Sequence, residues 1–447
     1  MNLVKDYKQY FTPDKLAEYM VNMIPDDSIK TVIDLSMGEC GLLEKAKDRW
    51  PDARLYGADI DEELILKINK DSPYIKTFHG DSLSSDLENW KSYNKIVKKR
   101  GFDLAIANPP FDFYKQSEVD INQNEKKIMP IEIRFLYQYI DIVKENGYIC
   151  IILPYGFLSL DLYKEIRRQL PEKVTIIKIM KIFNTCFKKI DADTCLMLMK
   201  KKKKQKISQS YINVQYLDSD YELSVCQNVQ ISETDRWDLE YQSLLKNSDI
   251  FTQNVKMKKD ILGNYIQECR RGKSITNNKE LLANKGIRYI HTTDLQKLYI
   301  TNKNKRYVSN DKEFFGKAVL SENMVLIGRV GKGCLGKTGI VLKSYSGMFF
   351  SDCIYAVRLQ NINPYYVTLF LASEFGQMQL KGIAKGSCSK YITQEGLFNI
   401  CILIPDRELQ DYYGNEYKKL ISRPGPKNEI IFADLVEKLN QTIRKER

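Results

Sequence analysis

The fold of this chain is set by residues 31–43, which carry the sequence TVIDLSMGECGLL. The apolar start predicts a buried strand, and Gly38 and Gly41 predict a tight turn that leads into a helix. A helix that begins directly after a glycine turn presents free backbone N–H groups to a ligand. We therefore predict that this strand, turn and helix form a cradle for a bound ligand.

Two further segments continue this pattern, and each ends in an acidic residue. Residues 54–59 predict a second strand that ends at Asp59, and a third segment ends at Asp81. In doubly wound folds an acid at the tip of the second strand holds ribose hydroxyls. Asp81 can accept a hydrogen bond from an adenine amino group. Taken singly, each acid is more often a helix cap or a solvated turn, but their order predicts a doubly wound α/β sheet.

The most specific motif is Asn108-Pro109-Pro110-Phe111, which follows an apolar strand predicted over 102–107. The prolines fix φ and lack N–H donors, so a stiff loop presents the Asn108 side-chain oxygen and the Pro109 carbonyl as acceptors. Two acceptors on the protons of an aromatic amine can draw its lone pair towards sp3 character, while Phe111 offers a stacking face. The motif indicates methylation of an exocyclic amino group, although Asn-Pro also marks ordinary turns after strands.

In this order the motifs resemble those of the N6-adenine DNA methyltransferases in which the cofactor motifs precede a catalytic Asn-Pro-Pro-aromatic loop. The resemblance covers residues 1 to about 205 and implies a Rossmann-like methyltransferase domain over 1–206 that uses S-adenosyl-L-methionine. The residues that it assigns to catalysis are Asn108, Pro109, Pro110 and Phe111. The residues that it assigns to cofactor binding are Tyr10, Phe11, Thr12, Pro13, Asp34, Gly38, Asp59, Ile60, Asp81 and Asn108. Phe187 is the candidate for a second aromatic that stacks on the target adenine opposite Phe111, and a core phenylalanine explains it equally well.

Two alternative functions remain open at this point. RNA methyltransferases and protein-glutamine methyltransferases can share the Asn-Pro-Pro-aromatic clamp, because a glutamine amide poses the same chemical problem as a base amine. The family usually has a glycine two positions after Gly38, where this chain has Cys40. The second alternative is therefore a DNA-binding specificity component whose cofactor loop is catalytically impaired.

The polar, irregular stretch over 207–255 predicts a linker, and a second domain is expected over 256–447. This second half resembles one target-recognition half of the specificity subunits of type I restriction-modification systems, in which short strands alternate with glycine turns. The resemblance implies a C-terminal α+β domain that recognises a DNA target. The basic residues of its glycine turns can contact phosphates or guanine edges, and the candidates are Arg271, Lys273, Arg329, Lys332 and Lys390. Any one of them alone is more often a surface residue on a loop.

Composition agrees with a partner that is a polyanion. Lysine and arginine number 69 against 57 acidic residues, which gives a net charge of +12. The ten cysteines include no Cys-x-x-Cys pair and there are two histidines, so we expect neither a metal site nor a disulfide framework. We find no membrane-spanning window and no signal peptide, which predicts a cytoplasmic protein without membrane contact.

Residues 429–444 carry apolar side chains at helical spacing, namely Ile430, Phe432, Leu435, Leu439 and Ile443. This stripe predicts a helix that either packs within its own chain or forms the seam of a homodimer, and packing within the chain is the commoner outcome. Together, the two halves predict a site-specific DNA adenine-N6 methyltransferase of a restriction-modification or related defence system. It would act on a flipped adenine of double-stranded DNA, and any cleavage would come from a separate restriction subunit.

Overall fold

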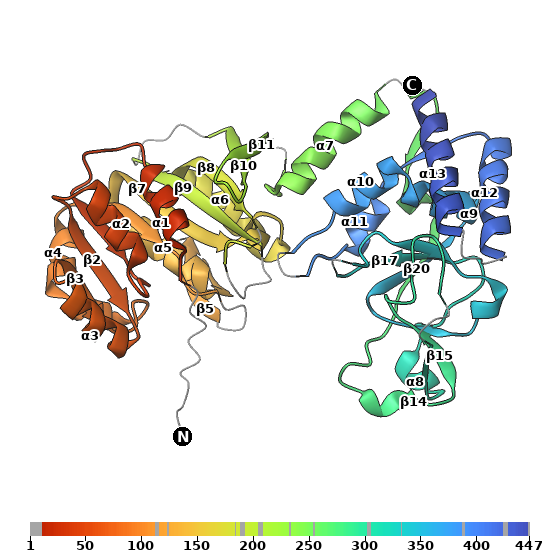
Figure 1. Cartoon of the computed structure of the whole chain (residues 1–447), viewed down its shortest axis with the longest axis horizontal. Coiled ribbons are helices and arrows are strands. Elements are labelled where there is room, and N and C mark those ends of the chain that lie inside the picture. The colour runs from red at the N-terminus through yellow and green to blue at the C-terminus, as the bar shows by residue number, and fades with distance from the viewer. Residues whose placement is uncertain are drawn as a thin grey trace. The chain divides into compact units, whose positions relative to one another are not determined.

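The structure is a computed structural model. It describes residues 11–111, 116–122, 125–183, 185–187, 193–203, 209–231, 234–253, 255–301, 305–331, 333–386, 389–422 and 428–445. The chain divides into two compact units, Met1–Leu239 (unit 1) and Glu240–Arg447 (unit 2). Figure 1 labels the helices and strands of both units, which are described separately below.

Unit 1 is built on a nine-stranded sheet with the order β11-β10-β8-β9-β7-β4-β1-β2-β3. The strands are β1 (Thr31–Asp34), β2 (Arg54–Asp59), β3 (Ile75–His79), β4 (Phe102–Ala107), β7 (Val143–Pro154), β8 (Val174–Ile182), β9 (Thr194–Lys201), β10 (Tyr211–Leu217) and β11 (Leu223–Gln230). From β7 to β3 every pair is parallel, whereas β9 runs antiparallel to both β7 and β8. A separate hairpin, β5 (Gln116–Asn122) and β6 (Glu125–Pro130), follows the loop after β4.

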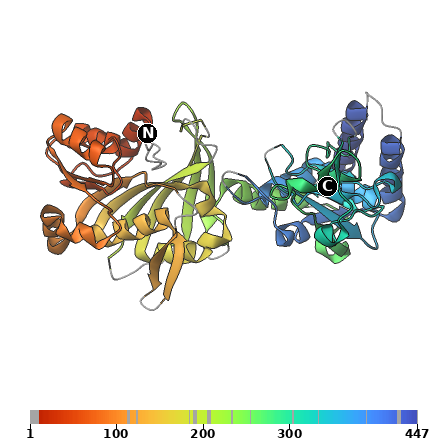
Figure 2. The ribbon, with the colours of Figure 1, turned by 90° about the horizontal axis from the view of Figure 1, so that it is seen from below.

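Helices cover both faces of this sheet, as Figure 2 shows. They are α1 (Asp14–Asn22), α2 (Gly41–Arg49), α3 (Glu62–Asp71), α4 (Lys91–Lys99), α5 (Ile131–Ile142) and α6 (Lys164–Lys173). Side chains alternate across a strand, so Val32 of β1 joins the core cluster that holds residues of α1, α2 and α3, while Ile33 joins the cluster under α4, α5 and α6. The predicted doubly wound α/β sheet is therefore confirmed.

The polar stretch that predicted a linker over 207–255 has a different structure. Within it, β10 pairs parallel to β8 and β11 closes the edge of the sheet, so unit 1 extends beyond the predicted boundary at 206. Ile212, Val214 and Leu217 are buried, while the side chains between them are less so. A strand with only one buried face carries polar residues on the other face, which is why the sequence of β10 resembled a loop.

Unit 2 combines three small sheets with a group of helices. The four-stranded sheet β13-β20-β17-β18 contains β13 (Ile266–Arg271), β20 (Ile354–Leu359), β17 (Val325–Gly328) and β18 (Thr338–Ile340). The second sheet contains β14 (Leu282–Ala283), β16 (Arg306–Val308), β15 (Ile287–Ile290) and β19 (Phe349–Phe350), and the third pairs β12 (Lys258–Ile261) with β21 (Cys401–Ile404). The helices are α7 (Leu239–Thr252), α8 (Lys312–Phe315), α9 (Pro364–Ala372), α10 (Glu374–Gly382), α11 (Gln394–Phe398), α12 (Arg407–Ser422) and α13 (Asn428–Lys445).

The apolar stripe of α13 packs within the chain. Phe432, Leu435, Leu439 and Ile443 belong to the buried core of unit 2, whereas Ile430 is 67% exposed. Of the two alternatives for this helix, the structure shows the intramolecular one. Among the described residues, no helix combines the length and the apolar character that a membrane span requires.

Candidate active site

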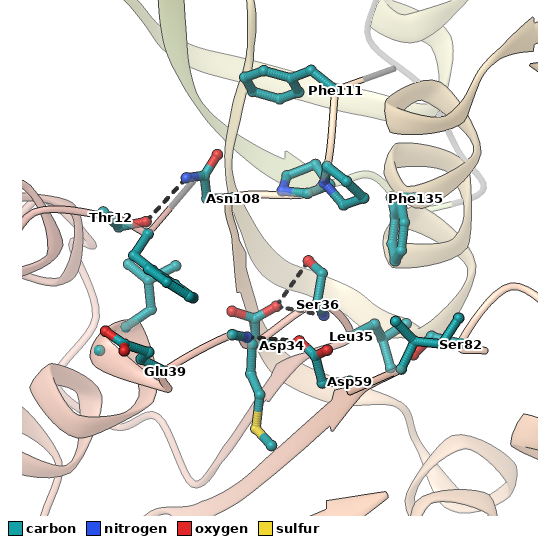
Figure 3. Close-up of a pocket in the computed structure, with 18 of the residues that line it drawn as sticks. Thr12, Asp34, Leu35, Ser36, Glu39, Asp59, Ser82, Asn108, Phe111 and Phe135 are labelled. Carbon is teal, nitrogen blue, oxygen red and sulfur yellow. Dashed lines mark hydrogen bonds between the residues drawn. The ribbon is translucent and has the colours of Figure 1, made fainter. Parts of the chain in front are cut away.

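A cavity of about 520 Å³ lies at the carboxyl ends of β1, β2 and β4 in unit 1. Figure 3 shows how side chains from these strand ends surround it. This is where doubly wound sheets hold their ligands. The predicted residues that line the cavity are Phe11, Thr12, Asp34, Gly38, Asp59, Ile60, Asp81, Asn108, Pro109, Pro110 and Phe111. Pro13 precedes α1 as its N-cap, and Tyr10 lies outside the described residues.

The loop after β1 is held to the end of β2 by a hydrogen bond from its backbone to a side chain. Gly38 has a left-handed φ of 52°, and its N–H donates to Asp59 Oδ2 at 2.8 Å. A Cβ atom at this glycine would lie 3.0 Å from the ring of Phe11, so the residue leaves room for that ring. The glycine that the family pattern expects next is absent, and Cys40 itself adopts the left-handed conformation, with φ 59° and ψ 16°.

Cys40 therefore changes the chemistry of the loop less than its position suggests. Its side chain is 5% exposed, and its Sγ donates to Glu44 Oε1 at 3.6 Å. Burial and the neighbouring Glu44 carboxylate raise the pKa of the thiol to about 12. The group stays protonated at neutral pH and is a poor nucleophile.

Asp34 is the most deeply buried acid of the cavity, at 1% exposure. Its Oδ1 accepts hydrogen bonds from the Ser36 N–H at 2.9 Å and from the Tyr139 hydroxyl at 3.4 Å. Burial is the main cause that raises the pKa of this carboxyl to about 7, and the nearby charge of Asp59 adds to it. The two hydrogen bonds hold the carboxyl in place but only partly offset its loss of solvation.

The acids at the ends of β2 and β3 hold the backbone of the cavity walls. Asp59 accepts from Gly38 through one oxygen and from the Asp61 N–H through the other, at 3.0 Å. Burial raises the pKa of Asp59, and these two hydrogen bonds act in the opposite direction. Asp81 accepts from the Leu83 N–H at 2.9 Å, and Ile60 presents an exposed apolar side chain beside it.

The loop after β4 is oriented by a contact with the segment that precedes α1. Asn108 Nδ2 donates to Thr12 Oγ1 at 3.2 Å. With its nitrogen held there, the amide oxygen points to the side of the cavity on which Phe111 lies, as Figure 3 shows. Sequence analysis placed Thr12 and Asn108 in one site, and this hydrogen bond joins them directly.

Ser82 and Phe135 are among the cavity residues that were not predicted from the sequence. Ser82 is 4% exposed, and its hydroxyl is a buried polar group for which the described structure provides no hydrogen-bond partner. Phe135 reaches the cavity from α5. The position of Ser82 next to Asp81 was a usable signal, whereas nothing distinguished Phe135 from the other apolar residues of its helix.

Phe187 does not line the cavity. It is 7% exposed and belongs to the core cluster on the α1 face of the sheet, in agreement with the core alternative. Phe111 packs at the edge of the same cluster, together with Phe183, Tyr19 and Tyr221. The Tyr221 ring lies 5.8 Å from that of Tyr19 and 5.7 Å from that of Phe183, a grouping that the sequence did not reveal.

The basic residues predicted to bind DNA in unit 2 differ in their surroundings. Arg271, the last residue of β13, and Lys273, just after that strand, are exposed, whereas Arg329 is half-buried. Lys390 forms an ion pair with Glu240 at 2.7 Å. Lys332 lies outside the described residues.

Comparison with known proteins connects this geometry to one family. The family model described as N-6 DNA Methylase matches residues 2–278, which is more than half of the chain. A Type II restriction enzyme and methyltransferase, RM.Eco57I of Escherichia coli, is 28% identical over 206 residues, covering 42% of this chain and 19% of that protein. The Type II methyltransferase M.BsuBI of Bacillus subtilis is 24% identical over 214 residues, covering 42% of this chain and 41% of that protein. The chain thus matches less than half of the length of either relative.

A solved structure supports the fold across both units. The ATP-dependent Type ISP restriction-modification enzyme LlaBIII, bound to DNA, aligns with a TM-score of 0.52 and 12% identity. The alignment covers 92% of this chain and 40% of that one. At this level of identity the similarity concerns the fold alone.

Proposed function

The chain belongs to the N-6 DNA methylase family, and from this premise we propose that it transfers a methyl group from S-adenosyl-L-methionine to N6 of an adenine in double-stranded DNA. The proposal rests on one observation above all. The glycine loop after β1 and the Asn-Pro-Pro-Phe loop after β4 face a single cavity. A Rossmann-like cofactor site occurs with many chemistries, so the acceptor loop beside it is what specifies amine methylation.

The cavity fits the proposed cofactor in size and in charge. Its volume of about 520 Å³ falls within the roughly 300–1,000 Å³ typical of small-molecule sites. S-adenosyl-L-methionine supplies an electrophilic methyl group on a positively charged sulfur when it is bound. Asp34 and Asp59 would provide opposite charge, Gly38 and Phe11 a close-fitting wall, and the buried Ser82 hydroxyl a further hydrogen bond.

The loop after β4 would activate the amine. In the proposed arrangement the N6 protons donate to the Asn108 side-chain oxygen and to the Pro109 carbonyl, which concentrates the lone pair on nitrogen. Thr12 keeps the amide oxygen of Asn108 directed at the base, and Phe111 provides the stacking face. The lone pair then forms the new N–C bond as the C–S bond electrons return to sulfur, and the proton leaves N6 for water. The adenine must leave the duplex stack to reach this loop.

We place this activity in a restriction-modification or related defence system of the cytoplasm, where a separate restriction subunit would supply any cleavage. RM.Eco57I is named a Type II restriction enzyme and methyltransferase, and M.BsuBI a Type II methyltransferase, which supports that setting. Recognition of the DNA target would fall to unit 2, through the exposed basic residues Arg271 and Lys273 at the end of β13.

The first prediction concerns Asn108. Purified full-length chain should transfer labelled methyl groups to duplex DNA, and Asn108→Ala should reduce the rate by roughly a hundredfold or more, because the clamp acts mainly in the transition state. DNA binding by the variant should remain nearly intact. Thr12→Val, which removes only the anchor of the Asn108 amide, should give a smaller loss of rate.

Parallel assays with RNA and with a glutamine-containing protein substrate would identify the other amine methylations if DNA were not the substrate. Absence of heat on titration of the wild-type chain with the cofactor would instead favour the impaired specificity component. An unchanged rate in Asn108→Ala would remove that residue from the proposed mechanism.

A further inference from the structure

Arg271, Asp352 and Arg329 meet at one end of the four-stranded sheet of unit 2. In the register of that sheet, Arg271 and Ile327 both lie opposite Tyr355, so β13, β20 and β17 reach the same end together. Arg271 Nη2 lies 3.4 Å from Asp352 Oδ2, and Arg329 Nη1 donates to the Asp352 carbonyl at 3.2 Å. The acid just before β20 thus contacts both arginines.

The backbone brings Arg271 and Asp352 together through Gly272. A Cβ atom at Gly272 would lie 2.2 Å from the Phe350 carbonyl oxygen and 2.3 Å from that of Ser351, so only glycine permits this approach. The Lys273 N–H also donates to the Phe350 carbonyl at 3.0 Å. Close packing of these two backbone segments therefore fixes the position from which the Arg271 side chain extends.

Arg329 is bound within the unit. Its Nε donates to the Tyr355 hydroxyl at 3.3 Å, and its guanidinium carbon lies 5.6 Å and 5.9 Å from the ring centres of Tyr355 and Tyr391. Its backbone N–H donates to the Cys353 carbonyl at 2.9 Å. These contacts make Arg329 a support for the turn that carries Asp352.

Arg271, in contrast to Arg329, has an exposed side chain. Its side chain is 55% exposed while that of Asp352 is 27% exposed, so the ion pair lies at the surface with the guanidinium on the outside. A guanidinium has five N–H donors in a rigid fork, and the contact with Asp352 occupies one of them. A fork oriented by a carboxylate loses less entropy when it binds a second planar partner.

Resting on the proposed function, we infer that Arg271 reads a guanine edge in the major groove of the target DNA and that Asp352 is the positioning residue that orients it. Guanine O6 and N7 accept together from one arginine fork, which is the commonest specific contact between a side chain and a base. The Asp352 carboxylate disfavours a phosphate at the same place, because two negative charges would then share one arginine. Lys273, a point charge two residues further along the chain, is the contrasting phosphate contact.

Selection by binding tests this inference without requiring methylation. Duplexes with a randomised region are bound to immobilised full-length chain, and the retained fraction is sequenced for the wild type and for Arg271→Ala, Asp352→Ala and Lys273→Ala. Arg271→Ala and Asp352→Ala should both reduce the preference for guanine at one and the same position by about tenfold or more. Lys273→Ala should weaken binding to all sequences, lower the salt dependence of binding and leave the selected sequence unchanged.

Two results would overturn the inference. One is that Arg271→Ala retains the full selected sequence and binds every duplex more weakly to the same degree, as a phosphate contact would. The other is that Asp352→Ala and the conservative variant Asp352→Asn, both checked for native circular dichroism, keep the wild-type preference at the position that Arg271→Ala affects. Methylation of the selected duplexes is measured separately, so failure of transfer would count against the proposed activity while the selected sequence still tests the role of Arg271.

Discussion

At the scale of single residues, Asp34 links the chemistry of the cavity to pH. Its folded-state pKa of about 7 lies above the value of roughly 4 expected in the unfolded chain. Between these two values the folded protein binds a proton that the unfolded protein does not, so stability falls as pH rises from about 4 to 7. The full loss of stability that follows from this pKa difference is roughly 4 kcal/mol. It arises because the Asp34 carboxyl is buried, and a cation bound in the cavity would neutralise its charge.

We predict that Asp34→Asn removes this dependence. The variant should be about as stable as the wild type at about pH 4 and below and more stable near pH 8, because the amide keeps an oxygen for Ser36 and Tyr139 but never ionises. Urea unfolding followed by tryptophan fluorescence measures the effect in unit 1, since Trp50, Trp90 and Trp237 all lie there. If the wild type and Asp34→Asn lost stability to the same extent as pH rises, another titrating group would be responsible.

The residues of the site differ in how far the sequence could predict them. Gly38, Asp59 and Asn108 were predicted because each stands at or shortly after the end of a strand, in a fixed order along the chain, and all three line the cavity. Ser82 stands next to Asp81, which was a usable signal, but the burial of its hydroxyl is a property of the folded chain and could not be read from the sequence. For Phe187 the sequence left a stacking role and a core position equally open, because its position in a hydrophobic cluster depends on packing that the sequence does not express.

At the scale of secondary-structure elements, Asp103 joins three neighbouring strands. Its Oδ2 accepts from the Thr31 hydroxyl at 2.9 Å and from the Lys30 N–H at 3.1 Å, and its Oδ1 contacts Lys144 Nζ. Although burial alone would raise the pKa of Asp103, the hydrogen bonds from Lys144 and Thr31 outweigh it and hold the pKa below its usual value. The side chain thereby ties β4 to the start of β1 and to β7, the strands that carry the candidate site.

Asp103→Asn is expected to destabilise unit 1 by about 2 kcal/mol at neutral pH, because buried donors would lose a charged acceptor. Since the folded-state pKa is depressed, this contribution is present above the unfolded pKa of roughly 4 and is lost as pH falls through the lower folded value. The stability difference between the variant and the wild type, measured by urea unfolding, should therefore shrink at pH 3. Thr31→Val, which keeps the ion pair, should show little of this pH dependence, and a difference that is constant with pH would contradict the electrostatic account.

The elements themselves were predictable where helices and strands alternate. β1, β2 and β4 are short apolar runs that end in turns, and they form the parallel half of the sheet as expected. The edge formed by β10 and β11 was not predicted, because both strands carry polar residues on an exposed face. β10 owes its strand conformation to pairing with β8, and β11 to antiparallel pairing with β10. Strand pairing between segments that are distant in the sequence is only weakly indicated by the local residue pattern.

At the scale of the whole molecule, each unit has core residues of its own. Two clusters fill the faces of the large sheet in unit 1, and two others lie in unit 2. The segment from 207 to 239 belongs to unit 1 through more than its strands, because the Trp237 N–H donates to the Leu158 carbonyl at 2.9 Å and the buried Arg167 donates to the Asp235 carbonyl at 2.7 Å. An independently folding methyltransferase unit should therefore end near 239.

The last prediction compares fragments 1–239 and 1–206. We expect fragment 1–239 to be soluble, to unfold cooperatively and to bind S-adenosyl-L-methionine with the affinity of the full-length chain, because every described residue of the cavity and its supporting core is retained. Fragment 1–206 should aggregate, since it exposes the edge of β8, loses Ile212 and Val214 from the core and leaves buried Arg167 without the Asp235 carbonyl. Size-exclusion chromatography and calorimetric titration measure both properties. Equal behaviour of the two fragments would mean that β10 and β11 are dispensable additions to the sheet, and failure of fragment 1–239 to fold would mean that unit 1 depends on unit 2.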